Sequence, residues 1–338
     1  MDSWRIFTGT GEPHDRISSL PEPPRWRQFE RDSETLEWVD EPPALSNRDR
    51  TRGESFRVSQ DNDDLVNVVN AALYLRRPLL VTGKPGTGKT SLAYRIAYEL
   101  NLGAVLSWSI TARAALQDGL YRYDAISRLQ DVQLKKTSYS DRDENSNIGR
   151  YIQLGPMGTA LLPAKRPRVL LIDEFDKSDI NLPNDLLNLF EEGEFEIPEL
   201  ARLAKDTERV QVRTYDGQEV TLRAGKVKCD SFPFILLTSN GERDFPPAFL
   251  RRCLRLTMPD PTENALVDMV KAHLGDEVIK EAEPLIEQFV EKRIKGDLSP
   301  DQLLNAVYLV TRQFSPVGGD QAKLMDVLMK YLSSAEDG

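Results

Sequence analysis

The sequence predicts an α/β domain, a parallel sheet flanked by helices, followed by a small all-helical domain. Three short apolar runs are typical of buried parallel strands, at residues 79–82, 169–172 and 234–238. The first run leads through a glycine-rich turn into a stretch of helix-forming residues, so a strand, a turn and a helix are expected in that order. After the Pro259-Asp260-Pro261 break, the apolar residues recur with helical spacing only.

The composition is that of an ordinary globular protein. The 338 residues are 40% hydrophobic and 29% charged, enough for two domains with separate cores. No apolar run approaches the roughly 18 residues needed to span a bilayer, and the N-terminus lacks a signal-peptide pattern, so a cytoplasmic location is expected. Cys229 and Cys253 are expected to be reduced thiols. Because the chain has only two histidines, we do not expect a zinc site or a histidine-based catalytic site.

The net charge of −10 argues against non-specific nucleic-acid binding, although a ring could still hold a local basic channel.

Residues 1–50 are rich in proline and charge, yet they carry three of the four tryptophans. Disordered segments usually avoid aromatic residues. Two interpretations stay open: a disordered tail, or an arm that docks on a neighbouring subunit, on its own core or on a partner.

The remaining elements follow from local patterns. Asp61 to Asp64 suit a helix start, and the apolar residues from Leu65 to Ala72 form one face of that helix. Further along, the sequence predicts a strand at 104–110, a helix at 113–129, a polar loop at 135–149, a helix at 182–192 and a hairpin whose strands are 210–215 and 218–222. Helices are expected at 262–274, 277–295, 299–313 and 320–333. The predicted division is an arm at 1–50, an α/β core at 51–258 and a helical lid at 259–338.

Residues 83–90, Gly-Lys-Pro-Gly-Thr-Gly-Lys-Thr, match the phosphate-binding pattern G-x-x-x-x-G-K-[ST]. A chance glycine-rich turn is the alternative, but the flanking strand and helix supply the context that the motif needs. Backbone N–H groups and the helix dipole would hold phosphates, Lys89 would reach the β- and γ-phosphates, and the Thr90 hydroxyl would hold Mg²⁺. The predicted nucleotide-binding residues are Gly83, Pro85, Gly86, Thr87, Gly88, Lys89, Thr90 and Ser91.

Two further strand ends carry polar residues suited to triphosphate hydrolysis. Asp173 and Glu174 follow an apolar strand, so Asp173 is expected in the Mg²⁺ shell and Glu174 is expected to polarise the attacking water. Because adjacent side chains of a strand point to opposite faces, the two acids are expected to have different tasks. Asn240 follows another apolar strand and could orient the water or touch the γ-phosphate; a plain turn Asn beside Gly241 is the alternative.

Arg251 and Arg252 end a short apolar helix. Such a pair is often only a solvated helix end, but in a ring ATPase one arginine can reach the neighbouring subunit's γ-phosphate.

This order of motifs resembles the AAA+ ATPases over about residues 55–335, and within them the MoxR group. The segment Gly155-Pro156-Met157-Gly158 before the acidic strand and the stretch Pro247 to Cys253 carry the closer likeness. The likeness places Arg252 on the arginine-finger position, with Arg251 able to share or replace it. It implies ATP and Mg²⁺ as ligands, a ring that is commonly a hexamer, and chaperone-like remodelling of a protein client or a von Willebrand factor A domain partner.

One departure from the family concerns the lid. The family usually has an arginine after a Ser-Pro pair, where this chain has Asp301 after Ser299-Pro300; Arg312 is an alternative base. This departure keeps a second function open, a nucleotide-gated switch or scaffold in a signalling or defence complex with slow hydrolysis. A nucleic-acid motor or a GTP-using relative is a third reading. Tyr139 and Tyr151 could grip a substrate, but ordinary packing is the favoured role for each.

Overall fold

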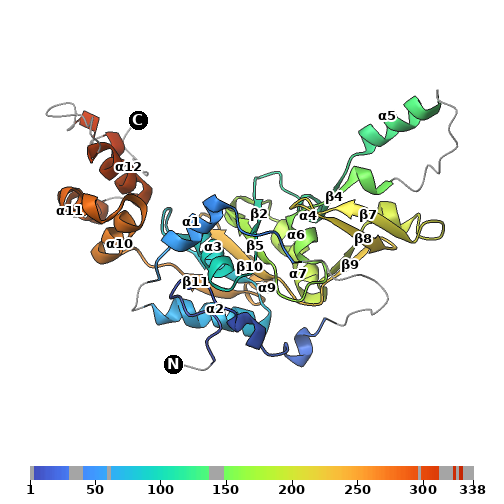
Figure 1. Cartoon of the computed structure of the whole chain (residues 1–338), viewed down its shortest axis with the longest axis horizontal. Coiled ribbons are helices and arrows are strands. Elements are labelled where there is room, and N and C mark those ends of the chain that lie inside the picture. The colour runs from blue at the N-terminus through green and yellow to red at the C-terminus, as the bar shows by residue number, and fades with distance from the viewer. Residues whose placement is uncertain are drawn as a thin grey trace.

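The computed structural model describes residues 4–29, 41–58, 62–136, 148–295, 298–311, 323–324 and 327–329. In these ranges a central parallel sheet lies between a second sheet on one side and a group of helices on the other (Figure 1).

The central sheet confirms the predicted α/β class. Its five parallel strands run in the order β11-β1-β10-β5-β2, so the strand before the phosphate loop lies in the interior, between β11 and β10. The strands are β1 (Leu79–Thr82), β2 (Leu106–Ser109), β5 (Val169–Asp173), β10 (Phe234–Ser239) and β11 (Leu254–Thr257). The sequence analysis did not identify β11, whose charged and polar residues interrupt its apolar pattern.

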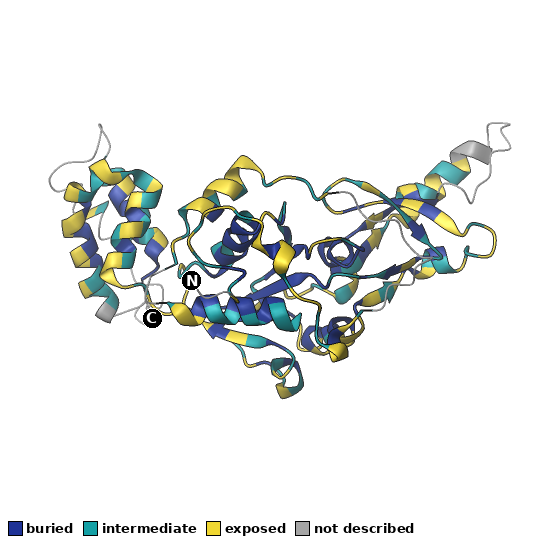
Figure 2. Ribbon diagram, turned by 60° about the horizontal axis from the view of Figure 1, so that its bottom comes forward, coloured by how far each residue is buried: buried dark blue, intermediate teal, exposed yellow. Residues whose placement is uncertain are grey.

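In β1, β5 and β10, alternate residues enter two different cores. Leu80 and Leu237 contribute to the core under α7 (Leu182–Glu192) and α9 (Pro247–Leu250). Leu79 and Leu236 contribute to the core under α2 (Asp63–Leu75) and α3 (Lys89–Glu99). With both faces covered, the sheet is buried, which explains its nearly continuous apolar strands (Figure 2).

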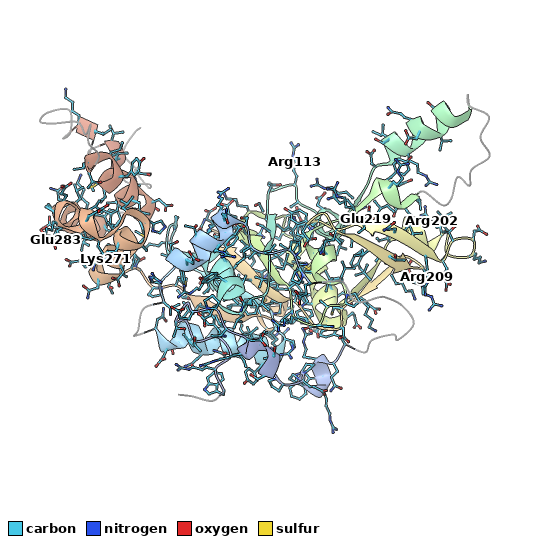
Figure 3. The ribbon with its side chains drawn as sticks, in the orientation of Figure 1. Arg113, Arg202, Arg209, Glu219, Lys271 and Glu283 are labelled. Carbon is cyan, nitrogen blue, oxygen red and sulfur yellow. The ribbon has the colours of Figure 1, made fainter. Side chains whose placement is uncertain are left out.

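The second sheet has the order β3-β4-β7-β8-β9-β6. The predicted hairpin is confirmed by β7 (Arg209–Arg213) and β8 (Glu219–Arg223), which pair antiparallel. Figure 3 shows side chains of this region, such as Arg209 and Glu219, far from the helices at the C-terminal end. The other strands are β3 (Tyr121–Tyr123), β4 (Ile152–Leu154), β6 (Glu194–Glu196) and β9 (Lys226–Lys228).

The single helix predicted at 113–129 is wrong. The chain forms α4 (Leu116–Leu120), then β3, then α5 (Ala125–Lys136). Tyr121 to Tyr123 pair with β4, about thirty residues away, and this non-local pairing overrides the local helical pattern. The remaining short elements are α6 (Pro156–Ala160), α8 (Pro198–Ala201) and five 3₁₀ turns at 16–19, 25–27, 148–151, 175–177 and 276–278.

The described part of the N-terminal arm docks on the chain's own core. The side chain of Asn70 in α2 accepts hydrogen bonds from the backbone N–H groups of Ile6 and Phe7, at 2.7 and 2.9 Å, and donates to the Phe7 carbonyl. Glu99 in α3 accepts from residues 8, 9 and 11. A helix that the sequence analysis did not predict, α1 (Asn47–Ser55), packs on α3 and crosses the proposed boundary at residue 50.

The C-terminal helices have a core of their own. α10 (Glu263–Leu274), α11 (Ile279–Lys295) and α12 (Pro300–Val310) bury Leu266, Phe289 and Leu303 among themselves. Most of the predicted helix at 320–333, together with Arg312, lies outside the described residues. The three-part domain division therefore stays a proposal. In the described ranges, no helix is long and apolar enough to cross a membrane.

Candidate active site

The phosphate loop joins the end of β1 to the start of α3, as its motif predicts. Gly86 and Gly88 have φ values of 76° and 85°, in the left-handed region that favours glycine. A Cβ atom on Gly88 would lie 2.6 Å from the Phe56 ring, and one on Gly86 would lie 2.4 Å from the Ser299 hydroxyl oxygen. The loop conformation thus requires glycine for both backbone and packing reasons.

Lys89 is buried inside this loop. Its ammonium group donates to the carbonyl oxygens of Gly83 and Lys84, at 2.6 and 2.8 Å. Burial lowers the pKa of Lys89 from its ordinary value, an effect that the carboxylates of Asp176, Asp173 and Glu174 oppose. A desolvated cation between backbone amides at a helix N-terminus suits a phosphate group.

Asp173 joins the acidic strand to the phosphate loop. Its Oδ1 atom accepts from the Thr90 hydroxyl at 3.0 Å and from the Thr238 hydroxyl at 2.6 Å. Hydroxyl and carboxylate oxygens are the ligands that Mg²⁺ prefers, so Thr90 and Asp173 fit as the residues that would hold this ion. Sequence reasoning missed Thr238; its place two residues before Asn240, near the end of a buried strand, was the available signal.

Glu174 has an unusual backbone. Its φ of 58° and ψ of 45° are left-handed, a conformation that costs a non-glycine residue about 1 kcal/mol. Its N–H donates to the Thr238 hydroxyl at 2.9 Å, and its carboxylate pairs with Lys177 at 2.8 Å. The expected strand alternation of Asp173 and Glu174 does not apply, because β5 ends at Asp173 and the chain turns there.

Asn240 follows β10 directly, beside the acidic turn. Its N–H donates to the Asp176 carboxylate at 2.8 Å, and its amide nitrogen lies 3.4 Å from Glu242. Asp176 is buried, with 6% of its surface exposed, and also accepts from the N–H of Glu242. Sequence reasoning missed Asp176, although it is an acid only two residues after Glu174.

The two arginines after α9 have different surroundings. Arg252 donates to the Glu191 carboxylate of α7 at 2.6 Å and to the Ala248 carbonyl at 3.2 Å. Arg251 is exposed, and its side chain forms no ion pair with any residue that the structure describes. Tyr151, considered above as a substrate-gripping residue, donates to Asp131 at 2.6 Å; Tyr139 lies outside the described ranges.

The C-terminal helices contact the phosphate loop through Ser299 and Pro300, next to the position where this chain has Asp301 in place of the family's arginine. α12 begins at Pro300 with a capping box between Ser299 and Gln302, and Ser299 lies over Gly86. Asp301, the following residue, is exposed.

Taken together, the carboxyl ends of three neighbouring parallel strands bring polar side chains to the phosphate loop. β1 leads into Lys89 and Thr90, β5 ends at Asp173, and β10 ends next to Asn240. Parallel α/β sheets bind their ligands at this edge. The arrangement can hold a triphosphate and a hard cation and present a carboxylate to water.

A comparison with known protein families identifies the domain that contains the phosphate loop. The family model of the AAA domain, dynein-related subfamily, matches residues 78–253, slightly more than half of the chain. A solved structure described as C. elegans PCH-2 is similar at a TM-score of 0.41 and 14% identity, covering 85% of this chain and 72% of that chain; nothing further rests on this likeness. No match was found among curated proteins. Because the family match spans more than half of its length, the chain belongs to the dynein-related subfamily of the AAA domain and contains an AAA-type ATPase domain.

Proposed function

We propose that this protein is a MoxR-like AAA+ ATPase that binds and hydrolyses ATP with Mg²⁺ in a hexameric ring and thereby remodels or activates a partner protein. The contact between Thr90 of the phosphate loop and Asp173 of the acidic strand end is the observation that carries this proposal. It joins the two motifs that triphosphate hydrolysis requires. A client protein or a von Willebrand factor A domain partner follows from the MoxR likeness.

In this mechanism Lys89 binds the β- and γ-phosphates in place of its own loop carbonyls. Thr90 and Asp173 would hold Mg²⁺, which would supply charge that neutralises the triphosphate. Glu174 accepts a proton from the attacking water, and Asn240 orients that water through its amide. Asp176 positions Asn240, since it holds the Asn240 N–H.

Replacing Glu174 tests the proposal. We expect Glu174→Gln to bind ATP but to lose hydrolysis by about two to four orders of magnitude, because the amide cannot take the proton. Mass determination of this variant should find a hexamer with ATP. Glu192→Gln, an exposed acid at the end of α7, is the matched control and should retain the parent's turnover. A persistent monomer, or undiminished hydrolysis, would contradict the proposal.

A second candidate is the slow nucleotide-gated switch. The pairing of Glu174 with Lys177 favours it, because the carboxylate oxygen held by the ammonium group must leave that contact before it can face an attacking water. The same variant separates the two functions. A motor loses turnover and partner remodelling together, whereas a switch keeps its partner complex in the ATP-locked form.

A further inference from the structure

A half-exposed acid in the connection between sheet and lid links the phosphate loop to the helices. Asp260 lies between β11 and α10. The connection is fixed beside the loop, since the Met258 N–H donates to the Thr82 carbonyl at 2.8 Å and Met258 packs against Gly83. The position of Asp260 is therefore set by the ATPase core, not by the lid alone.

The Asp260 carboxylate contacts two cations from different elements. Its Oδ2 atom lies 3.4 Å from the Lys84 ammonium group in the phosphate loop. Its Oδ1 atom accepts from Arg293 Nη2 in α11 at 3.0 Å. One carboxylate thus joins a loop cation to a lid cation, each through a different oxygen atom.

Arg293 is an unusual member of this group. Only 9% of its side chain is exposed, against 51% for Asp260 and for Lys84. Its Nε and Nη1 atoms are buried and have no hydrogen-bond partner in the described part of the chain. A single carboxylate oxygen does not use all the N–H donors of this buried guanidinium. The group can therefore bind a more highly charged anion in its place.

The lid also contacts the loop through packing. Ser299 and Pro300 lie so close to Gly86 that a Cβ atom there would be 2.4 and 2.6 Å from them. The charged contact at Lys84 and the packed contact at Gly86 lie two residues apart in the loop. The phosphate loop therefore contacts the C-terminal helices at two places, through Lys84 and Asp260 toward α11 and through Gly86 at the start of α12.

We propose that Asp260 is a positioning residue. Its ion pairs with Lys84 and Arg293, which we call the clasp, couple the occupancy of the nucleotide site to the position of the lid. Asp260 has this role in a chain that carries the exposed Asp301 at the position of the family's lid arginine. Triphosphate oxygens compete with the Asp260 carboxylate for the two cations, and the change in contacts of Arg293 shifts α11. This competition rests on the proposed ATP binding, but the ion pairs of the clasp do not.

The test uses the full chain with spin labels at Lys271→Cys in α10 and Arg113→Cys after β2, both exposed (Figure 3). Labelled chains are diluted into unlabelled chains so that one subunit is measured. Without nucleotide, Asp260→Asn and Arg293→Gln should each broaden the label-to-label distance distribution. The double variant should add nothing further, because both changes open the same contact. Asp260→Glu should retain the parent's distribution, and the exposed acid Asp268→Asn is the matched control.

Nucleotide binding supplies the second readout. Asp260→Asn removes the competing carboxylate, so the affinity for a non-hydrolysable ATP analogue should rise about two- to fivefold, the range for a partly exposed charge pair. Parental distances and parental affinity in Asp260→Asn would overturn the clasp, as would the same shift in Asp268→Asn or additive shifts in the double variant. Since the distances are measured without nucleotide, failure of ATP binding in the parent would refute the proposed function and leave the clasp to be judged separately.

Discussion

At the residue scale, burial determines the chemistry of the two thiols. Cys229 is fully buried and Cys253 is 6% exposed, and both are free. Burial raises the pKa of each thiol to about 12. Structural cysteines of this kind are inert, because the thiolate is the reactive form.

We therefore expect neither cysteine to react with iodoacetamide at pH 8 until the protein unfolds, since about one thiol in ten thousand is ionised at that pH. The unfolded thiols ionise near the ordinary value of 9.0, below the folded ones. Their contribution to stability is thus complete below pH 9 and falls as the pH rises from 9 toward 12. Mass spectrometry with and without urea checks the labelling. Ser109→Cys, an exposed position, is the control that should react at once.

At the element scale, the arm, α2 and α3 are joined by side chains that satisfy backbone groups. Asn70 and Glu99 are fully buried, and between them they accept hydrogen bonds from the N–H groups of residues 6–9 and 11. Arg95, also buried, donates to the Gly53 and Gly9 carbonyls. The helix that begins in the phosphate loop is therefore held at its other end by the arm.

Asn70→Ala should lower the free energy of unfolding by about 2 kcal/mol, because buried N–H and C=O groups of residues 6 and 7 lose their partner. Urea unfolding measures this change. The matched control is Asn67→Ala on the same helix. Among the described residues its partly buried side chain accepts from Arg5 alone, so this change should alter stability by less than about 0.5 kcal/mol. Equal effects of the two variants would mean that the arm contact contributes little.

At the scale of the whole molecule, assembly into a ring would need a cation free to leave its own subunit. Arg252 is held by Glu191, which also lies 3.7 Å from Arg27 of the arm, whereas Arg251 is exposed. The likeness to MoxR proteins favours Arg252 for the contact across subunits, and the geometry of the single chain favours Arg251.

We expect Arg251→Ala to leave the melting temperature unchanged and to abolish the rise of ATPase activity with protein concentration, a loss of about a thousandfold if the residue acts as an arginine finger. Arg252→Ala should instead lower stability by about 0.2–1 kcal/mol through its lost ion pair. Steady-state ATPase assays over a concentration series, with thermal unfolding in parallel, distinguish the two. The reverse pattern would return the finger role to Arg252.

Local residue patterns were enough to predict the α/β class, the phosphate loop and the acidic strand end. A glycine-rich turn between a buried strand and a helix is a short-range signal, and so are four apolar residues followed by Asp173 and Glu174. Strand β11 and the division of residues 113–129 into α4, β3 and α5 could not be predicted from such short-range signals. Their conformation depends on pairing with β1 and β4, which are distant in sequence.

The candidate site shows the same contrast between residues that local sequence predicts and partners that only tertiary contacts determine. The residues that would carry the proposed chemistry, from Lys89 to Asn240, were predicted from strand ends and one motif. Their supporting partners Thr238 and Asp176, and the link from Asp260 to Arg293, were decided only by tertiary structure. Hydrogen bonds and ion pairs between distant segments depend on where the packed sheet and lid place each side chain, and periodicity along the chain carries no record of that placement.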